Sequence, residues 1–117
     1  MNVTAIVELI KAQGPAWPRL ENDTHLMCIG SGRPLEEAWR AGQVEMIGWI
    51  GELYGLDRLD AYQLLSQISE VPIANVVDTN YSAVTKIDKR LLPSSPAYGG
   101  IHDQMRSVAR SLGAISY

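Results

Sequence analysis

The sequence predicts an α+β fold in which short β-strands flank a central helical hairpin, followed by a C-terminal amphipathic helix. Its 117 residues are enough for one hydrophobic core. Its 46% hydrophobic and 20% charged positions are typical of a globular domain. The strand-like and helix-periodic segments follow the order strand, strand, helix, helix, strand, strand, helix. The helices therefore form a block between two pairs of strands.

The first third of the chain predicts two strands and an edge segment. Val3 to Ile10 is rich in β-branched residues and precedes the turn residues Gln13-Gly14-Pro15, so we expect a strand and then a turn. The segment 17–21 contains a proline, which favours a loop or a sheet edge. Thr24 to Ile29 is apolar and β-prone, and we expect Gly30-Ser31-Gly32 to end this strand.

The strongest periodic pattern predicts a long helix after Pro34, which suits a first helical turn. We expect this helix to end at Gly55 in a left-handed cap. Gly42 lies within the apolar stripe, which favours close backbone packing against a sheet, whereas Gly48 and Gly51 either pack or lie on a tolerant exposed face. The stripe consists of Leu35, Ala38, Trp39, Met46, Trp49, Ile50 and Leu53, with Arg40, Gln43, Glu45 and Glu52 expected on other faces.

A second helix and two further strands follow. Asp57 is placed to cap the helix, which has a broad apolar face as far as Ser69. The composition of 71–77 returns to that of a strand, and 78–80 is a turn cluster. Alternation then predicts a strand from Tyr81 to Asp88. The helix face consists of Leu59, Ala61, Tyr62, Leu64, Leu65 and Ile68.

The last part of the chain predicts a linker and a tail. Residues 94–100 have linker composition, and residues 101–117 have helical spacing of apolar side chains. We therefore expect a main region over 1–93, a linker over 94–100 and a tail helix over 101–117.

Charge and cysteine content exclude several classes of protein. The net charge is −3 and the basic residues are scattered, which argues against a nucleic-acid partner. We expect neither a signal peptide nor a membrane partner, because no apolar run approaches the roughly 20 residues of a membrane span. A lone cysteine, Cys28, favours a reducing compartment, and we expect a cytoplasmic protein.

Candidate chemical groups are few. The chain has no GxSxG, P-loop, HExxH, CxxC or GxGxxG pattern, so no cofactor or metal is indicated and both stay unknown. His25 follows Glu21 by four residues, and the two side chains form an acid/base pair if they point to the same side; the alternative is a structural histidine at the start of a strand. Trp17, in a proline-flanked loop, is a candidate for lining a pocket or an interface.

Four further residues or segments are expected to be structural. We expect Trp39 and Trp49 to belong to the core, and Cys28 to be a small buried apolar residue rather than a nucleophile. Gly30-Ser31-Gly32 precedes a helix and could face an anion, but a plain turn is favoured, since no phosphate-binding lysine accompanies it.

Several short motifs in order resemble the C-terminal third of the acetamidase/formamidase family. The resemblance extends over roughly residues 3 to 93. The motifs are Trp17-Pro18-Arg19-Leu20-Glu21 with His25 following, a long helix with Glu36, Ala38 and Met46-Ile47, Leu56-Asp57 through Asp60-Ala61-Tyr62-Gln63-Leu64-Leu65-Ser66, Ile73-Ala74-Asn75-Val76-Val77-Asp78, and Ile87-Asp88-Lys89.

The resemblance implies a fragment of a β-sandwich-containing amidase fold and the hydrolysis of small linear amides to carboxylate and ammonia. It also implies an incomplete site, because the Gly-Asp-x-His-Ala and Gly-Asp-Gly-Glu segments typical of the family have no counterpart here. We therefore expect a C-terminal portion or small subunit that is inactive alone. Glu21 and His25 are the expected site contacts, with Trp17 lining the site.

The expected partner is a second chain that carries the N-terminal amidase region, or further copies in a homo-oligomer, together with a small amide substrate. The strand resembling Val3 to Ile10 is interior to a sheet in the family, so a chain that starts there would expose unpaired backbone groups. The alternative function is a non-catalytic oligomerising interaction module derived from the same fold.

Overall fold

The computed structural model describes residue 3 and residues 5–113. These residues fall into two compact units, each described by itself below. Residues Pro15–Ser95 form one unit, and the other combines the residues up to Gly14 with those from Pro96 onward. Among the described residues, no helix is long and apolar enough to cross a membrane.

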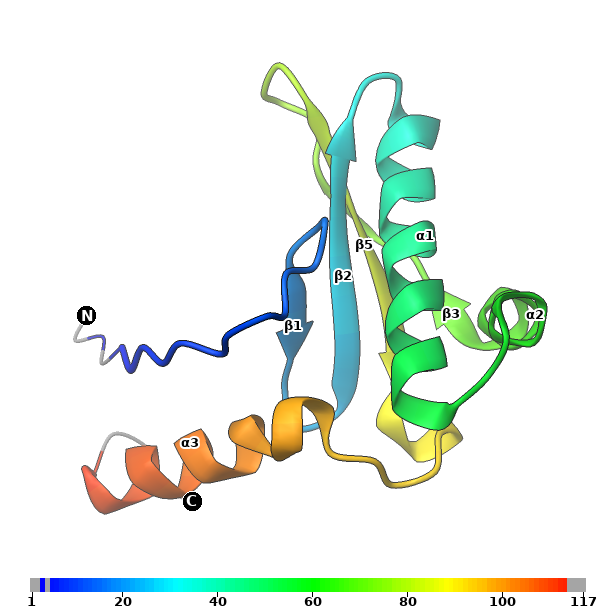
Figure 1. The fold of residues 1–117 in the computed structure, drawn as a ribbon. Helices are drawn as coiled ribbons and strands as arrows, with labels where there is room; N and C mark the ends of the chain where they lie inside the picture. The colour runs from blue at the N-terminus through cyan, green and yellow to red at the C-terminus, as the bar shows by residue number, and fades with distance from the viewer. Residues whose placement is uncertain (1–2, 4, 114–117) are drawn as a thin grey trace. The chain divides into compact units, whose positions relative to one another are not determined.

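An antiparallel sheet forms one layer of the unit Pro15–Ser95 (Figure 1). Its strand order is β1-β2-β5-β3, and β4 also pairs with β5. Two eight-residue strands, β2 and β5, form its centre in a continuous register from His25 opposite Asp88 to Gly32 opposite Tyr81. The strands are β1 (Arg19–Glu21), β2 (His25–Gly32), β3 (Ser69–Glu70), β4 (Ile73–Asn75) and β5 (Tyr81–Asp88).

Two helices form the second layer. Helix α1 (Leu35–Tyr54) runs alongside β2 and β5, and α2 (Arg58–Ile68) lies beside the C-terminal half of α1 (Figure 1). The predicted caps are confirmed, because Gly55 adopts a left-handed conformation and Asp57 accepts hydrogen bonds from the backbone at the start of α2. The core between the layers contains Leu26, Cys28, Ala38, Met46, Trp49, Ile50, Ala61, Leu65, Ala83, Thr85 and Ile87.

Glycines bring α1 into close backbone contact with the sheet. A Cβ atom at Gly30 would lie 2.0 Å from the carbonyl oxygen of Ala38 and 2.5 Å from the nitrogen of Gly42. The expected packing role of Gly42 is confirmed, since a Cβ there would lie 2.9 Å from Oγ1 of Thr85. The two undecided glycines differ: Gly48 faces open space, whereas a Cβ at Gly51 would meet the carbonyl of Leu56 at 3.2 Å.

Several strand predictions need correction. The predicted strand Val3 to Ile10 is wrong over its described residues, which are exposed and belong to no strand, because β-prone side chains form a strand only where a ladder partner accepts them. Gly30-Ser31-Gly32 does not end the second strand but continues it, since the missing side chain of Gly30 admits the helix. The segment 71–77 contains β4 but is preceded by a separate strand, β3, with Pro72 between them. Of the loop or sheet edge expected within 17–21, the structure shows a sheet edge, because Arg19–Glu21 form the outer strand β1.

Several helix predictions also need correction. Trp39 is 45% exposed rather than in the core, whereas Trp49 is buried as expected. The sheet contacts the side of α1 that carries Ala38 and Gly42, and Trp39 is rotated by about 100° around the helix from Ala38. Glu45, expected on a face other than the apolar stripe, is buried at 7% exposure. Leu59 and Tyr62, assigned to the apolar face of the second helix, are exposed. Helix α2 is seen along its axis in Figure 1, so the two helices cross instead of forming a hairpin of antiparallel helices.

The other unit contains the predicted tail helix. Helix α3 (Ile101–Ser111) follows a short 3-10 turn, η2 (Ala97–Gly99), and begins after Gly100. A second 3-10 turn, η1 (Lys89–Leu91), belongs to the unit Pro15–Ser95. The tail helix was expected to extend to residue 117; its described part ends at Ser111, and residues 114–117 lie outside the described residues. The described strands form a single sheet, so the expected sandwich stays a prediction.

Candidate functional site

The register of β1 and β2 decides on which face of the sheet each candidate lies. Glu21 pairs with Leu26, a buried core residue, so the side chain of Glu21 is on the face that α1 covers. His25 precedes Leu26 in β2 and therefore points to the opposite face, which we call the open face. The expected acid/base pair of Glu21 and His25 is therefore wrong in its geometry, because the sheet lies between the two side chains.

A buried ion pair dominates the face that α1 covers. Nε of Arg19 donates to Oε1 of Glu45 at 2.6 Å, and the two side chains are 9% and 7% exposed. The other oxygen of Glu45 accepts from the backbone N–H of Trp17 at 3.3 Å. The guanidinium also contacts Glu52 at 2.8 Å and lies over the ring of Trp49. The carboxylate of Glu45 is thus fully engaged and has a structural role.

The two other predicted residues, Glu21 on this face and Trp17 in the segment before β1, have partners of their own. Glu21 accepts from Nζ of Lys89 at 2.6 Å. Trp17 is half-buried, and its backbone is tied to Glu45. The negative charge of Glu21 also contributes to the raised pKa of Tyr54, although burial is the larger cause. The structure tests neither the expected substrate contact of Glu21 nor the lining role of Trp17.

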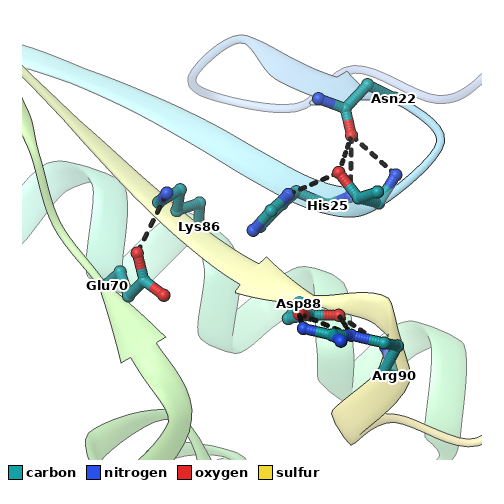
Figure 2. A network of polar contacts seen from close by, with 7 residues as sticks. Asn22, His25, Glu70, Lys86, Asp88 and Arg90 are labelled. Atoms are coloured by element: carbon teal, nitrogen blue, oxygen red, sulfur yellow. Dashed lines mark hydrogen bonds and ion pairs between the residues drawn. The ribbon is translucent and has the colours of Figure 1, made fainter.

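The open face carries His25 within a set of polar contacts from neighbouring strands (Figure 2). Nδ1 of His25 lies 2.7 Å from the hydroxyl oxygen of Thr24. Asp88 is the cross-strand partner of His25, and Lys86, two residues before it, pairs with Glu70 at 2.9 Å. This arrangement places a titratable imidazole beside two ion pairs.

Asp88 is not available as a proton acceptor for His25. Its carboxylate accepts from Nε and the backbone N–H of Arg90, and these hydrogen bonds lower its pKa to about 2. The positive charge of His25 contributes to the same shift as a smaller cause. Asp88 therefore stays ionised and bound to Arg90 at neutral pH.

Cys28 is an inert thiol, as predicted. It is fully buried beneath α1. Burial is the main cause that raises its pKa to about 12, the charge of Glu45 adds to the shift, and Arg19 opposes it. The described residues contain no group of three or more His, Cys, Asp or Glu side chains that could hold a metal ion.

Sequence reasoning missed the residues that surround His25. Asn22 and Thr24 lie in the turn before His25, and an Asn-Asp-Thr segment is typical of such turns. Asp88 and Lys86 come from a strand more than 60 residues further along the chain, and only the sheet register brings them to His25. Nothing in the local sequence indicates this contact.

One solved structure is similar to this chain over most of its length. It is the acetamidase from Yersinia enterocolitica, with 41% sequence identity and a TM-score of 0.69. The match covers 73% of this chain and 26% of the acetamidase, so the chain spans about a quarter of the protein that it matches. No family model matches the chain, and no curated protein matches it.

Proposed function

The chain belongs to the acetamidase/formamidase family, and we propose that it is the C-terminal portion or small subunit of an amidohydrolase that cleaves small linear amides. The observation that carries the proposal is the 41% identity to an acetamidase together with the shared fold. The region that matches is about a quarter of that enzyme, so the remaining region would come from another polypeptide or another part of the same one. The same remaining region would also complete the β-sandwich of the family.

Amide hydrolysis requires groups that the described residues do not bring together. A water must be activated, the developing oxyanion must be stabilised, and the leaving ammonia must receive a proton. Here Glu45 is bound to Arg19, Glu21 to Lys89 and Asp88 to Arg90. These engaged carboxylates support a chain that is inactive alone and becomes active when the remaining amidase region completes the site.

We propose His25 as the main contribution of this chain to the completed site. It is half-exposed on the open face, and its imidazole is the side chain best suited to proton transfer near neutral pH. Glu21 and Trp17 would support the site from the other face of the sheet. The proposed substrate is a small linear amide such as formamide or acetamide, and the proposed compartment is the cytoplasm.

The second candidate function is a non-catalytic module that forms oligomers. Its specific support is that three carboxylates of the described residues, Glu45, Glu21 and Asp88, are each paired with a cation. Exposed Trp39 on α1 supports a contact surface. Light scattering separates the alternatives in part, because a stable homodimer without amidase activity in any complex would favour the module.

Ammonia release from formamide and acetamide tests the proposal. The samples are the 117-residue chain alone and a chimera in which this chain replaces its matching quarter of the Yersinia acetamidase. We expect no turnover by the chain alone and turnover by the chimera, with His25→Gln as the inactive control. Turnover by the chain alone would overturn the proposal that it is inactive without a further amidase region. A folded but inactive chimera would overturn the amidase assignment.

A further inference from the structure

The turn before His25 is fixed by the side-chain amide of Asn22. Its Oδ1 atom accepts from the backbone N–H of Thr24 at 2.9 Å and from the backbone N–H of His25 at 2.7 Å (Figure 2). Because a backbone N–H can only donate, the atom that faces both must be the amide oxygen and not the amide nitrogen. The orientation of Asn22 is therefore determined by its neighbours.

The same oxygen sets the direction of the next hydrogen bond. The hydroxyl oxygen of Thr24 lies 3.2 Å from Oδ1 of Asn22 and 2.7 Å from Nδ1 of His25. Oδ1 carries no proton, so in the Thr24–Asn22 contact the hydroxyl must donate its single proton. The hydroxyl then has only lone pairs for the imidazole, and Nδ1 must donate to it.

We infer that Asn22 and Thr24 are positioning residues that hold the neutral imidazole of His25 as the Nδ1–H tautomer. The lone pair of Nε2 is then directed away from the turn, where it can accept a proton on the open face. Among the described residues no hydrogen bond to Nε2 is formed, and Asp88 opposite is bound to Arg90. The turn thus fixes which ring nitrogen can act as a base.

This inference rests on the proposed function for its chemical meaning. In amide hydrolysis, Nε2 takes a proton from the attacking water as the new carbon–oxygen bond forms. The imidazolium then returns that proton from Nε2 to the amide nitrogen as the carbon–nitrogen bond breaks, which releases ammonia and the carboxylic acid. Nδ1 keeps its proton throughout, and Thr24 holds the ring in place.

The backbone around the turn is built to keep this geometry. The backbone N–H of Lys89 donates to the carbonyl of Thr24 at 2.8 Å, and Nζ of the same lysine donates to the carbonyl of Asn22 at 2.5 Å. The backbone N–H of Asn22 donates to the carbonyl of His25 at 3.1 Å. The segment 22–25 is therefore tied both to itself and to the end of β5.

Nitrogen NMR on the 117-residue chain tests the tautomer without any need for activity. Long-range proton–nitrogen correlation at a pH at which His25 is neutral distinguishes the protonated from the unprotonated ring nitrogen, and His102→Gln assigns the signals. We expect a protonated Nδ1 in the wild type, loss of this preference in Thr24→Val, and its recovery in Thr24→Ser. Thr79→Val, in the 78–80 turn, is the matched control and should leave His25 unchanged.

A protonated Nε2 in the wild type would overturn the inference, and so would a tautomer that Thr24→Val does not change. Far-UV circular dichroism of each variant establishes that it is folded. If Thr24→Val does not fold, Asn22→Asp provides a second measurement, because it keeps the acceptor oxygen and should keep the Nδ1–H tautomer.

Amidase activity of the chimera provides a second test of the positioning role. We expect kcat to fall at least about 100-fold in His25→Gln and about 10-fold in Thr24→Val, with a changed pH profile and recovery in Thr24→Ser. An active chimera whose kcat and pH profile are unchanged in Thr24→Val would overturn the positioning role. An inactive chimera would instead overturn the proposed function and leave the NMR result as it stands.

Discussion

Replacing Gly30 by alanine should separate α1 from the sheet and destabilise the fold severely. The new Cβ would lie 2.0 Å from the carbonyl oxygen of Ala38 and 2.5 Å from the nitrogen of Gly42. Ordinary contact is about 3.5 Å, so the layers must move apart by roughly 1.5 Å at this point. Both neighbouring atoms belong to the helix backbone, and no side-chain rotation can relieve the contact.

The expected cost follows from what this movement disturbs. Overpacking of a core costs about 1–3 kcal/mol, and a gap of 0.5–1 Å already forfeits roughly a quarter to a half of each van der Waals contact across it. Fully buried Met46 and Ile50 and nearly fully buried Trp49 lie in the layer that would be displaced. We therefore expect Gly30→Ala to lower the free energy of unfolding by about 3 kcal/mol or more.

Two glycines of α1 provide graded controls for Gly30, which lies in β2. At Gly42 the new Cβ would meet Oγ1 of Thr85 at 2.9 Å, and Thr85 is fully buried and β-branched, so its side chain yields little. The nearest backbone atoms lie at 3.4 Å or more, so we expect a loss of about 1–2 kcal/mol, smaller than at Gly30. At Gly48 nothing lies within 4 Å, and alanine should stabilise the helix by roughly 0.5–1 kcal/mol. From the most to the least stable, the expected order is Gly48→Ala, wild type, Gly42→Ala and Gly30→Ala.

Urea unfolding followed by circular dichroism measures these effects. With a slope of about 1–3 kcal/mol/M for a small domain, a loss of 3 kcal/mol lowers the midpoint by roughly 1–3 M. A Gly30→Ala variant that unfolds at the wild-type midpoint would refute the close approach of α1 to β2. The reasoning would also fail if Gly48→Ala were as damaging as Gly30→Ala.

Three other predictions concern the ionisable groups. Glu45→Ala leaves Arg19 buried without its main partner and should lower the free energy of unfolding by about 3 kcal/mol. Glu52→Ala, at the exposed end of the same cluster, should lower it by less than about 1 kcal/mol, and equal shifts in urea midpoint would contradict this. The pKa of Asp88 falls from 3.8 to about 2 on folding, so its contribution to stability is present above about pH 4 and is lost as the pH falls toward 2. Asp88→Asn should therefore weaken the pH dependence of the thermal unfolding temperature between pH 2 and 5. Burial, with a smaller contribution from Glu45, raises the pKa of Cys28 to about 12, so a thiol reagent at pH 8 should label it only after unfolding in urea. Rapid labelling of the folded chain would count against its burial.

Local patterns were sufficient for the end of the long helix and the start of the second helix. The left-handed cap at Gly55 and the cap at Asp57 depend on residues within one turn, and both are confirmed. The strand Val3 to Ile10 could not be decided in this way, because β-branched residues form a strand only beside a paired neighbour. The glycines after Ile29 were mistaken for a turn for a related reason: their strand role depends on α1, which follows them in the chain.

The candidate site was harder to predict because its contacts are long-range. The helical spacing placed Glu45 off the apolar stripe, and its burial depends on Arg19, from a strand 26 residues earlier, and on the backbone N–H of Trp17. The four-residue spacing from Glu21 to His25 said nothing about orientation, since the chain reverses between them and the register then places them on opposite faces.

The distribution of charges over the two faces bears on where chemistry can occur. On the face that α1 covers, Arg19 and Glu45 neutralise one another within the core, so a substrate there would have to break a buried ion pair. On the open face, Asp88, the carboxylate opposite His25 in the part of the chain that the structure describes, is bound to Arg90. Proton transfer in an enzyme is efficient where water is excluded. Under the proposed function, a further region would therefore lie over the open face, where it would enclose His25 and supply hydrogen-bond donors for the oxyanion.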